Sequence, residues 1–376
     1  MTQQINHSYD VLIIGAGPAG TSAALTLLNH SDLRVAIIEQ SDLQKLRVGE
    51  SVSSTLFPLL DYLQVPKDCF NADCFTETQS TIAFWGSDTA TQRHAIFAAD
   101  MSTYQVDREQ FDLTLIDAVA GRGGIIYPRS KLQYMTFSEE AGWQVTVQHK
   151  EHGKITLNTG FIIDASGRNS TVINKVGSQR KSLDKLTGVG AFVRCKGDTR
   201  LPREQVIEST KHGWWYIAAL PGQHAVVTFF SDSDLLSSLR MNRPEQWLSA
   251  LQETNHAKHF LRNELPANIE LWVRKANSTQ TQFDHIKHFV SVGDAACSFD
   301  PISSMGLGFA MTSSAQAAVL VSQSFKEKDE RISKLLQQYQ KDIYNNFEDY
   351  LSLRNMFYAK EKRWAGSPFW QRRLSA

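Results

Sequence analysis

A glycine-rich hexapeptide, GAGPAG at residues 15–20, is the first pattern in this chain that could do chemistry. It follows the apolar, β-branched run Tyr9–Ile14 and precedes the Ala- and Leu-rich stretch Thr21–Leu28. These patterns predict a strand, a tight turn and a helix. Backbone amides at such a helix N-terminus bind phosphate, so the pattern predicts a dinucleotide site. The residues expected to form it are Gly15, Gly17, Pro18, Ala19 and Gly20.

Each glycine of this turn has a separate physical role. Gly15 permits the tight turn, Gly17 lets backbone amides approach a pyrophosphate, and Gly20 allows the helix to pack closely on the strand. A second predicted strand, Leu33–Ile38, ends at Glu39. A carboxylate at this spacing accepts hydrogen bonds from the ribose hydroxyls of an adenosine. The alternative for the whole pattern is an ordinary turn between a strand and a helix.

Two later turns also combine glycine with aspartate. The run Phe161–Gly167 (FIIDASG) and the run His288–Val292, followed by Gly293 and Asp294, each read as a strand that ends in a glycine-bearing turn. A long helix of small residues follows the second of these turns. Together with GAGPAG, they resemble in order the GxGxxG, DG and GD motifs of the flavin-dependent monooxygenase and halogenase superfamily, whose FAD-binding fold is that of p-hydroxybenzoate hydroxylase. Each turn taken singly could also be a structural loop.

This resemblance implies FAD as the cofactor and gives particular residues a role. Asp164 and Gly167 occupy the key places of the DG motif, Asp294 would contact the ribityl chain, and Pro301 would lie near the isoalloxazine ring. Backbone amides at the start of the following helix would donate to the N1/O2 edge of the flavin and stabilise its anionic reduced form. Those amides belong to Gly306, Leu307 and Gly308.

Two further segments refine the resemblance. The run RVGES, which contains Arg47, Glu50 and Ser51, resembles the GES segment of flavin-dependent halogenases and their relatives. Arg108, at the end of YQVDR, resembles an arginine that heads a helix beside the flavin. A buried arginine needs an anionic partner, which flavin phosphates or Glu50 could supply. The alternative for both arginines is a solvated ion pair on the surface.

Halogenation is disfavoured by the residues themselves. Flavin halogenases carry a lysine just before an Ile-x-Phe strand and a W-x-W-x-I-P segment. The corresponding strand, residues 78–85, contains no lysine, and HGWWYI at residues 212–217 has neither the W-x-W spacing nor the I-P ending.

A narrower resemblance comes from GWWYIAALPGQHAVVTFFSDSDL at residues 213–235 and GDAACSFDPISSMG at residues 293–306. Both are similar to the flavoproteins that accompany cysteine tryptophylquinone enzymes such as lysine ε-oxidase and glycine oxidase. The resemblance implies a monooxygenase that hydroxylates a tryptophan side chain in the precursor protein of a quinone-cofactor amino-acid oxidase. It would act through a flavin C4a-hydroperoxide formed from O2, with NAD(P)H or another protein as reductant and without a metal.

Two other classes of function remain open at this point. The chain could be an FAD monooxygenase or reductase that acts on a free small molecule. It could instead be a flavin-bearing assembly factor that binds the precursor without oxidising it.

Composition limits the classes of partner. The chain has 376 residues, and its 39 Lys and Arg balance its 39 Asp and Glu, which argues against binding to nucleic acid or to an anionic membrane. The polar N-terminal sequence lacks the features of a secretory signal, and no apolar run is long enough to cross a bilayer. The cysteine spacing fits neither a zinc site nor a disulfide framework, so a reduced cytoplasmic protein is expected. The cysteines are Cys69, Cys74, Cys195 and Cys297.

The elements that must position these residues are those of an α/β fold. Residues 1–80, 100–185 and 276–330 are expected to form a discontinuous, Rossmann-like FAD-binding domain. Residues 81–99 and 186–275 show period-two strands separated by turn residues, which predicts an interleaved antiparallel β-sheet domain over the flavin. Residues 331–376 carry apolar residues at helical spacing and are expected to form C-terminal helices.

Aromatic residues of the predicted sheet are the candidates for a substrate pocket, although aromatic strand residues more often pack in a core. His212 is the one candidate for a catalytic proton donor or acceptor, the alternative being a surface or turn residue. A late aromatic cluster, within residues 357–370, could cover the pocket, dock a partner or pack on the FAD domain. The pocket candidates are Trp85, Trp214, Trp215, Tyr216 and Phe230.

Overall fold

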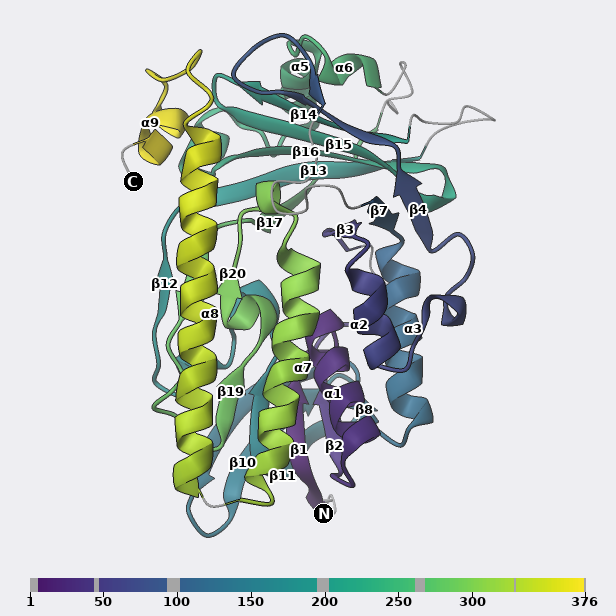
Figure 1. Cartoon of the computed structure of the whole chain (residues 1–376), viewed down its shortest axis with the longest axis vertical. Helices are drawn as coiled ribbons and strands as arrows, with labels where there is room; N and C mark the ends of the chain where they lie inside the picture. The colour runs from purple at the N-terminus through teal and green to yellow at the C-terminus, as the bar shows by residue number, and fades with distance from the viewer. Residues whose placement is uncertain are drawn as a thin grey trace.

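The computed structural model describes residues 6–43, 47–92, 102–194, 203–260, 268–327 and 329–374. Cys195 and residues 93–99 of the predicted substrate domain lie outside these ranges. Two large sheets lie one above the other, and a long helix, α8 (Asp329–Tyr358), runs beside both of them (Figure 1).

The lower sheet contains the first glycine-rich turn. Its strand order is β8-β2-β1-β11-β10-β9, and β19 also pairs with β11. The strands β2, β1, β11 and β19 are parallel, so their carboxyl ends lie at one edge, where the three glycine-bearing turns begin. The strand bounds are Asn6–Ile14 (β1), Val35–Ile38 (β2), Ile125–Tyr127 (β8), Ser130–Ser138 (β9), Gly142–His149 (β10), Gly153–Asp164 (β11) and Phe289–Ser291 (β19).

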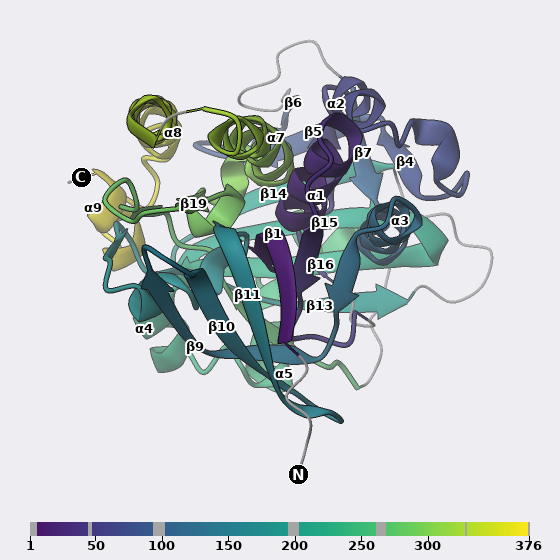
Figure 2. The ribbon, with the colours of Figure 1, turned by 90° about the horizontal axis from the view of Figure 1, so that it is seen from below.

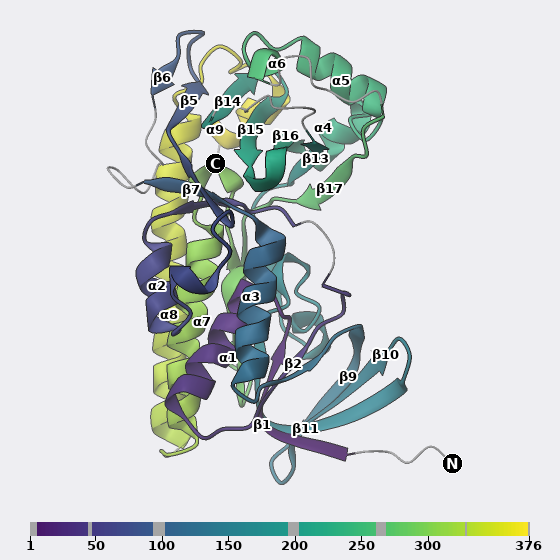
Figure 3. The same cartoon turned by 90° about the vertical axis from the view of Figure 1, so that its right-hand side faces the viewer.

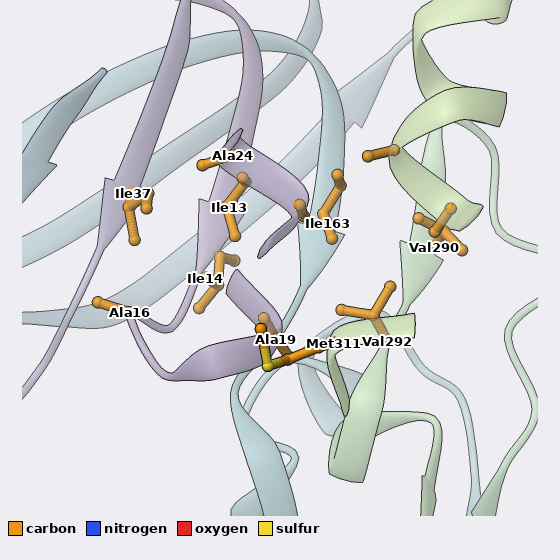
Figure 4. Close-up of a cluster of buried hydrophobic side chains, with 14 of the residues drawn as sticks. Ile13, Ile14, Ala16, Ala19, Ala24, Ile37, Ile163, Val290, Val292 and Met311 are labelled. Atoms are coloured by element: carbon orange, nitrogen blue, oxygen red, sulfur yellow. The ribbon is translucent and has the colours of Figure 1, made fainter. Parts of the chain in front are cut away.

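Helices α1 and α7 pack against each other on one side of β1 (Figure 2). The strand β1 begins earlier than its apolar run predicts, because residues from Asn6 onward pair with β11 even where they are polar. The apolar residues of β1, β2, β11 and β19 form the core beneath these helices; Ala19 of α1 and Met311 of α7 lie next to Val292 there (Figure 4). The helix bounds are Pro18–His30 (α1), Leu56–Tyr62 (α2), Arg108–Gly121 (α3) and Gly306–Ser324 (α7).

The upper sheet has the order β17-β13-β16-β15-β14-β5-β6. It is antiparallel except that β14 and β5 pair in parallel, a long-range pairing that local sequence does not reveal. Its strands come from the ranges assigned above to the substrate domain, while the domain boundaries themselves stay a prediction. The bounds are Ser80–Phe84 (β5), Thr91–Gln92 (β6), Leu186–Arg194 (β13), Glu204–Thr210 (β14), Gly213–Leu220 (β15), His224–Asp232 (β16) and Trp272–Lys275 (β17).

Both faces of the upper sheet are covered. On β15, Trp215 faces the helices on the outer side and packs edge-on against Trp247, whose indole N–H donates to the Val189 carbonyl. Trp214 faces the other way and stacks on Phe230 of β16 at 4.2 Å between ring centroids. Alternation along a strand thus sends neighbouring tryptophans to opposite faces. The outer helices are Ser233–Ser238 (α4), Pro244–Gln252 (α5) and Ala257–Phe260 (α6).

The C-terminal helices fasten the two sheets together. Along α8, the Tyr339 hydroxyl donates to the Ser313 carbonyl of α7, and the Tyr358 hydroxyl donates to Asp300. Beyond it, Trp370 of α9 (Pro368–Leu374) is buried and donates to the Thr210 carbonyl of the upper sheet. The late aromatic cluster therefore packs mainly on the upper sheet rather than on the FAD-binding part.

Two small sheets complete the described structure. Strands Ser51–Ser53 (β3), Phe75–Thr78 (β4) and Thr103–Val106 (β7) form one, and Arg180–Ser182 (β12), Thr279–Thr281 (β18) and Cys297–Ser298 (β20) form the other. Within the described ranges, no helix is both long and apolar enough to cross a membrane, and no group of acidic, histidine and cysteine side chains could hold a metal ion.

Candidate functional site

The three glycine-bearing turns meet in space. Gly15 has φ +114°, and a Cβ there would lie 2.3 Å from the Ala165 carbonyl oxygen of the second turn, so the first turn requires glycine. A Cβ on Gly20 would lie 1.8 Å from the Gly15 carbonyl oxygen, which explains how α1 packs so closely on β1. A Cβ on Gly293, in the third turn, would lie 3.0 Å from Ala19 of α1. Small residues in the three turns thus let segments far apart in the sequence touch.

Two helix N-termini at this junction have no capping side chain. The residue before α1 is Gly17, and the residue before α7 is Met305; neither provides a side-chain cap. A Cβ on Gly17, Gly306 or Gly308 would meet nothing within 4 Å. The first amides of both helices are therefore open to an anionic or hydrogen-bonding ligand, which a helix N-terminus stabilises.

A cavity of about 760 Å³ lies between the turns and the upper sheet. Its volume falls within the range of about 300–1,000 Å³ that is common for ligand sites. Of the residues predicted to bind FAD, the following line the cavity: Pro18, Glu50, Ser51, Arg108, Asp294, Pro301, Gly306 and Leu307. Most of the others belong to the turns and strand ends beside it. These others are Gly15, Gly17, Ala19, Gly20, Glu39, Arg47, Asp164, Gly167, Gly293 and Gly308.

Several buried oxygen atoms at the site lack a partner in the described structure. Asp164 is fully buried; its Oδ1 accepts from the Ser166 amide at 3.0 Å, while its Oδ2 has no hydrogen bond. Burial raises the pKa of this carboxyl to about 6. Asp294 pairs with Arg168 through Oδ2 at 3.2 Å and leaves Oδ1 without a partner. The hydroxyls of Ser166 and Ser291 lie beside the Asp164 carboxyl. Because buried polar atoms are almost always hydrogen-bonded, the Asp294 oxygen, whose residue lines the cavity, indicates a ligand with a donor group.

Glu39 lies where its predicted role requires a carboxylate. It directly follows β2, and its two carboxylate oxygens accept from the amides of Ala16 at 2.9 Å and Ser41 at 2.7 Å. Each oxygen keeps a lone pair for a further donor. The ribose contact itself stays a prediction.

The two predicted arginines share a partner that the sequence analysis missed. Arg108 makes a two-pronged contact with Asp112, with both distances 3.1 Å, and Arg47 reaches the same carboxylate at 2.9 Å. Arg108 also donates to the Val48 carbonyl at 2.7 Å, which fixes the loop that carries Glu50. Asp112 is one helical turn after Arg108, and that spacing was the available signal.

Glu50 and Tyr216 form a buried polar corner of the cavity. Burial raises the pKa of the Glu50 carboxyl, and its Oε2 accepts from the Gly49 amide at 2.7 Å. Burial also raises the pKa of the Tyr216 phenol, whose hydroxyl has no well-formed hydrogen bond within the described ranges although Glu50, Ser51 and Gln105 lie close by. Glu50, Ser51 and Tyr216 all line the cavity.

Three of the predicted pocket residues line the cavity, namely Trp214, Tyr216 and Phe230. The prediction was wrong for the other two. Trp215 faces α5, and Trp85 is buried among the C-terminal helices, with its indole N–H donating to the Phe357 carbonyl. Both bury large apolar rings in core clusters instead of facing the cavity.

His212 does not reach the cavity either. It lies in the turn between β14 and β15, beside Lys211, and it is not among the lining residues. Burial and then the Lys211 charge lower the pKa of its imidazole. The turn interpretation, which was the alternative above, therefore fits its place in the fold.

A match to a family model decides which family the chain is part of. The model described as tryptophan halogenase matches residues 10–103 and 88–375. The chain belongs to the tryptophan halogenase family. This family of flavin-dependent halogenases and FAD oxidoreductases makes the chain an FAD-dependent enzyme.

Among its relatives, the family member LodB of Marinomonas mediterranea, a suggested FAD-dependent oxidoreductase, is 40% identical over 367 residues, which are 97% of each chain. The tryptophan 2-halogenase of Chondromyces crocatus is 24% identical over 332 residues, 85% of this chain and 62% of that enzyme.

Two solved structures share the fold. The flavin-dependent halogenase CmlS matches with TM-score 0.84 and 24% identity, over 97% of this chain and 67% of that one. QhpG, a peptidyl tryptophan dihydroxylase essential for tryptophylquinone cofactor biogenesis, matches with TM-score 0.73 and 19% identity, over 97% of this chain and 78% of that one. At these identities the likeness concerns the fold, and the predicted fold class is confirmed.

The cavity wall also contains residues to which the sequence analysis gave no role. Asp300 is fully buried, and burial raises the pKa of its carboxyl; it accepts from Tyr358, whose oxygen in turn accepts from the Trp214 indole at 3.1 Å. Gly188 and Gly190 of β13 lie beneath the rings of Phe230 and Trp272. The two glycines of GVG at residues 188–190 could have indicated that large rings pack on β13. The contact between Asp300 and Tyr358 joins segments far apart in the sequence, so no local pattern predicts it.

Proposed function

We propose that this chain is an FAD-dependent monooxygenase that hydroxylates a tryptophan side chain in the precursor protein of a quinone-cofactor amino-acid oxidase, during cysteine tryptophylquinone biogenesis. The observation that carries the proposal is a single cavity with two chemically different walls. One wall has open helix N-termini and unpartnered carboxylate oxygens, and the other has the aromatic pair Trp214 and Phe230.

The first wall suits FAD. Amides at the start of α1, next to Gly17, would hold the pyrophosphate, and Glu39 would bind the ribose. Asp294 Oδ1 would accept from a hydroxyl group of the cofactor, and Asp164 would act from beside the site. The amides that begin α7 would face the flavin ring. When bound and reduced, FAD supplies the activation of O2 that places one oxygen atom on the substrate.

The second wall suits an indole. The stacked rings of Trp214 and Phe230 offer an apolar surface that excludes water, and Tyr216 adds a further aromatic ring to the lining. The C-terminal helices hold this wall in place, because the Trp214 indole N–H donates to Tyr358 at 3.1 Å. Orientation of the indole, rather than a strong base, is then the contribution of the protein.

The similarity to LodB, which extends over 97% of both chains, supports an oxidoreductase, and the likeness in fold to QhpG, a peptidyl tryptophan dihydroxylase, supports a peptidyl tryptophan as substrate. In the balanced reaction, one atom of O2 enters the indole and the other leaves as water. NAD(P)H or a partner protein would supply the two electrons.

The proposal is tested by mass spectrometry of a precursor protein. Holoprotein, reductant and O2 are incubated with the unmodified precursor of a quinone-cofactor oxidase, and its tryptophan peptides are analysed. We expect the mass of one or two added oxygen atoms on one tryptophan. A precursor with phenylalanine at that position is the control. Oxygen added only to free small molecules, or consumed with no product, would support the small-molecule enzyme or the assembly factor instead.

Halogenation is the second candidate because of the family to which the chain belongs. The strand β5 and its flanks, residues 78–85, contain no lysine. Within the described ranges, the lysine that lines the cavity is Lys275, on the exposed strand β17. Repeating the incubation with bromide distinguishes the two chemistries, since a brominated product carries the isotope doublet of bromine.

A further inference from the structure

The strand β17 is an open edge of the upper sheet at the mouth of the cavity. It pairs with β13, and no other described strand pairs with it (Figure 3). All four of its residues line the cavity, yet Val273, Arg274 and Lys275 are exposed, with 48% of Val273 accessible. An exposed edge presents backbone groups that another chain can pair with.

The hydrogen-bond pattern shows which groups of β17 point outward. The Ala276 amide donates to the Leu186 carbonyl at 2.9 Å, so these opposite residues form a hydrogen-bonded pair. Because such pairs alternate along antiparallel strands, Trp272 and Arg274 also bond to β13, whereas Val273 and Lys275 direct their N–H and C=O groups away from it.

These outward groups are largely free. The Val273 carbonyl accepts from the Arg274 guanidinium at 3.0 Å. The amides of Val273 and Lys275 and the carbonyl of Lys275 make no hydrogen bond in the part of the chain that the structure describes. A partner strand would therefore find two donors and one acceptor without displacing another strand.

The side chains of β17 also connect this edge to the cavity. Gly190 is opposite Trp272 and Gly188 is opposite Arg274, and a Cβ on Gly190 would lie 2.5 Å from the Trp272 ring. The Trp272 side chain therefore lies over β13 on the cavity face of the sheet, and its indole N–H is buried without a partner in the described structure. A strand added beside β17 would place every second side chain on this same face.

We propose that β17 binds the protein substrate as an additional strand, an extended segment whose backbone pairs with Val273 and Lys275 and whose tryptophan side chain enters the cavity. Arg274 and Lys275 give this edge two exposed positive charges, so the segment would carry acidic residues beside its tryptophan. Such strand addition takes affinity from main-chain hydrogen bonds and specificity from alternate side chains. The inference rests on the proposed function in taking a protein as the substrate.

The test uses the oxidised FAD-loaded protein and a fluorescent peptide of alternating Glu and Val with one central Trp, followed by anisotropy. Each peptide amide is N-methylated in turn, which removes one donor without changing a side chain. We expect methylation at alternate positions to weaken binding at least about tenfold, equal to about 1.4 kcal/mol, and methylation between them to have little effect. An equal effect at all positions, or binding that no methylation changes, overturns the proposal.

Protein variants provide the matching arm. Val273→Pro removes an outward amide that makes no bond to β13, while Val273→Ala keeps the amide and shortens the side chain. We expect the proline variant to lose peptide binding by about tenfold and the alanine variant to retain it. If Val273→Pro does not bind FAD or shows no thermal unfolding transition, Lys275→Pro is used in its place, because it removes the other outward amide. The experiment with methylated peptides needs no protein variant.

Two results separate this inference from the proposed function. Alternate-position dependence of binding without any oxygen added to the peptide would uphold the docking edge and refute the monooxygenase. Hydroxylation of the precursor at the same rate by Val273→Pro and by the wild type would refute the docking edge and uphold the monooxygenase. If light scattering shows that the edges of two copies pair, and that Val273→Pro makes the protein monomeric, a second copy is the occupant and the proposal fails.

Discussion

Replacing Asp294 by alanine should weaken FAD binding without unfolding the protein. The Asp294 carboxylate has one oxygen paired with Arg168 at 3.2 Å and a second, buried oxygen without a partner in the described structure. Arg168 would lose that ion pair but would keep its bonds to the carbonyls of Asn277 at 3.0 Å and Phe299 at 2.7 Å. Because both ionic groups are partly exposed, the lost pair should cost only about 0–1 kcal/mol of folding stability.

The cost to the cofactor should be larger. A hydrogen bond from a ligand hydroxyl to a charged acceptor contributes about 1.5–3 kcal/mol. The Kd for FAD should therefore rise about 10- to 100-fold, since about 1.4 kcal/mol corresponds to a factor of ten. The measurement is a titration of apoprotein with FAD, followed by quenching of flavin fluorescence.

Asp10→Ala is the matched control. The Asp10 side chain has the same 28% exposure as Asp294 and also pairs with an arginine, Arg34 at 3.1 Å, but it does not line the cavity. Its removal should leave the Kd for FAD unchanged. If Asp294→Ala binds FAD as tightly as the wild type, or if both variants weaken it equally, the assignment of Asp294 to the ribityl chain is wrong.

Three other changes should have separate effects. Gly17→Val should give a folded but colourless protein, because the added side chain enters open space predicted to hold the pyrophosphate; absorbance at the flavin band measures this, and a yellow variant would contradict it. The pKa of the Asp164 carboxyl is about 6 in the folded protein, against an ordinary value of 3.8 for aspartate. The protonated carboxyl therefore adds to the folding stability below pH 4, and this contribution is lost as the pH rises to 6. Asp164→Asn apoprotein should thus be up to about 3 kcal/mol more stable than wild type at pH 7 but not at pH 4, by urea unfolding. Arg373→Met should lower the free energy of unfolding by about 1–3 kcal/mol, because the buried Oδ1 of Asp232 loses its 2.8 Å partner while Oδ2 keeps Arg372 at 2.8 Å. Arg372→Met should cost about 1 kcal/mol or less, because Arg372 is exposed and Asp232 keeps Arg373. Equal losses would show that burial is not the cause.

The parts of the site that local sequence determines were predictable. The turn at Gly15 depends on a strand, a turn and a helix that follow one another directly, and Glu39 and Asp294 each lie just after the end of a buried strand. Such units are fixed by apolar pattern and by glycine positions. The structure places them at the carboxyl ends of adjacent parallel strands, as the motif order implied.

The pocket wall was predicted less well, for a reason visible in β15. Its sequence GWWYIAAL is apolar at both alternate sets of positions, so its periodicity does not say which face meets the cavity. Trp214 and Trp215 differ only because α5 covers the face of Trp215. Trp85 was misplaced because its partners lie on the C-terminal helices, far along the chain. These contacts depend on tertiary packing, which no local pattern encodes.

Three tyrosines connect α8 by hydrogen bonds to both walls of the site. Tyr339 is bonded to the backbone of α7, Tyr350 to Ser278 and the Asp300 amide, and Tyr358 to the Asp300 carboxylate and the Trp214 indole. A hinge movement that parted the sheets would have to break the bond between Tyr358 and Trp214, or pull α8 away from α7 and Asp300. A substrate that reached the cavity from its rim, beside β17, would leave these bonds intact.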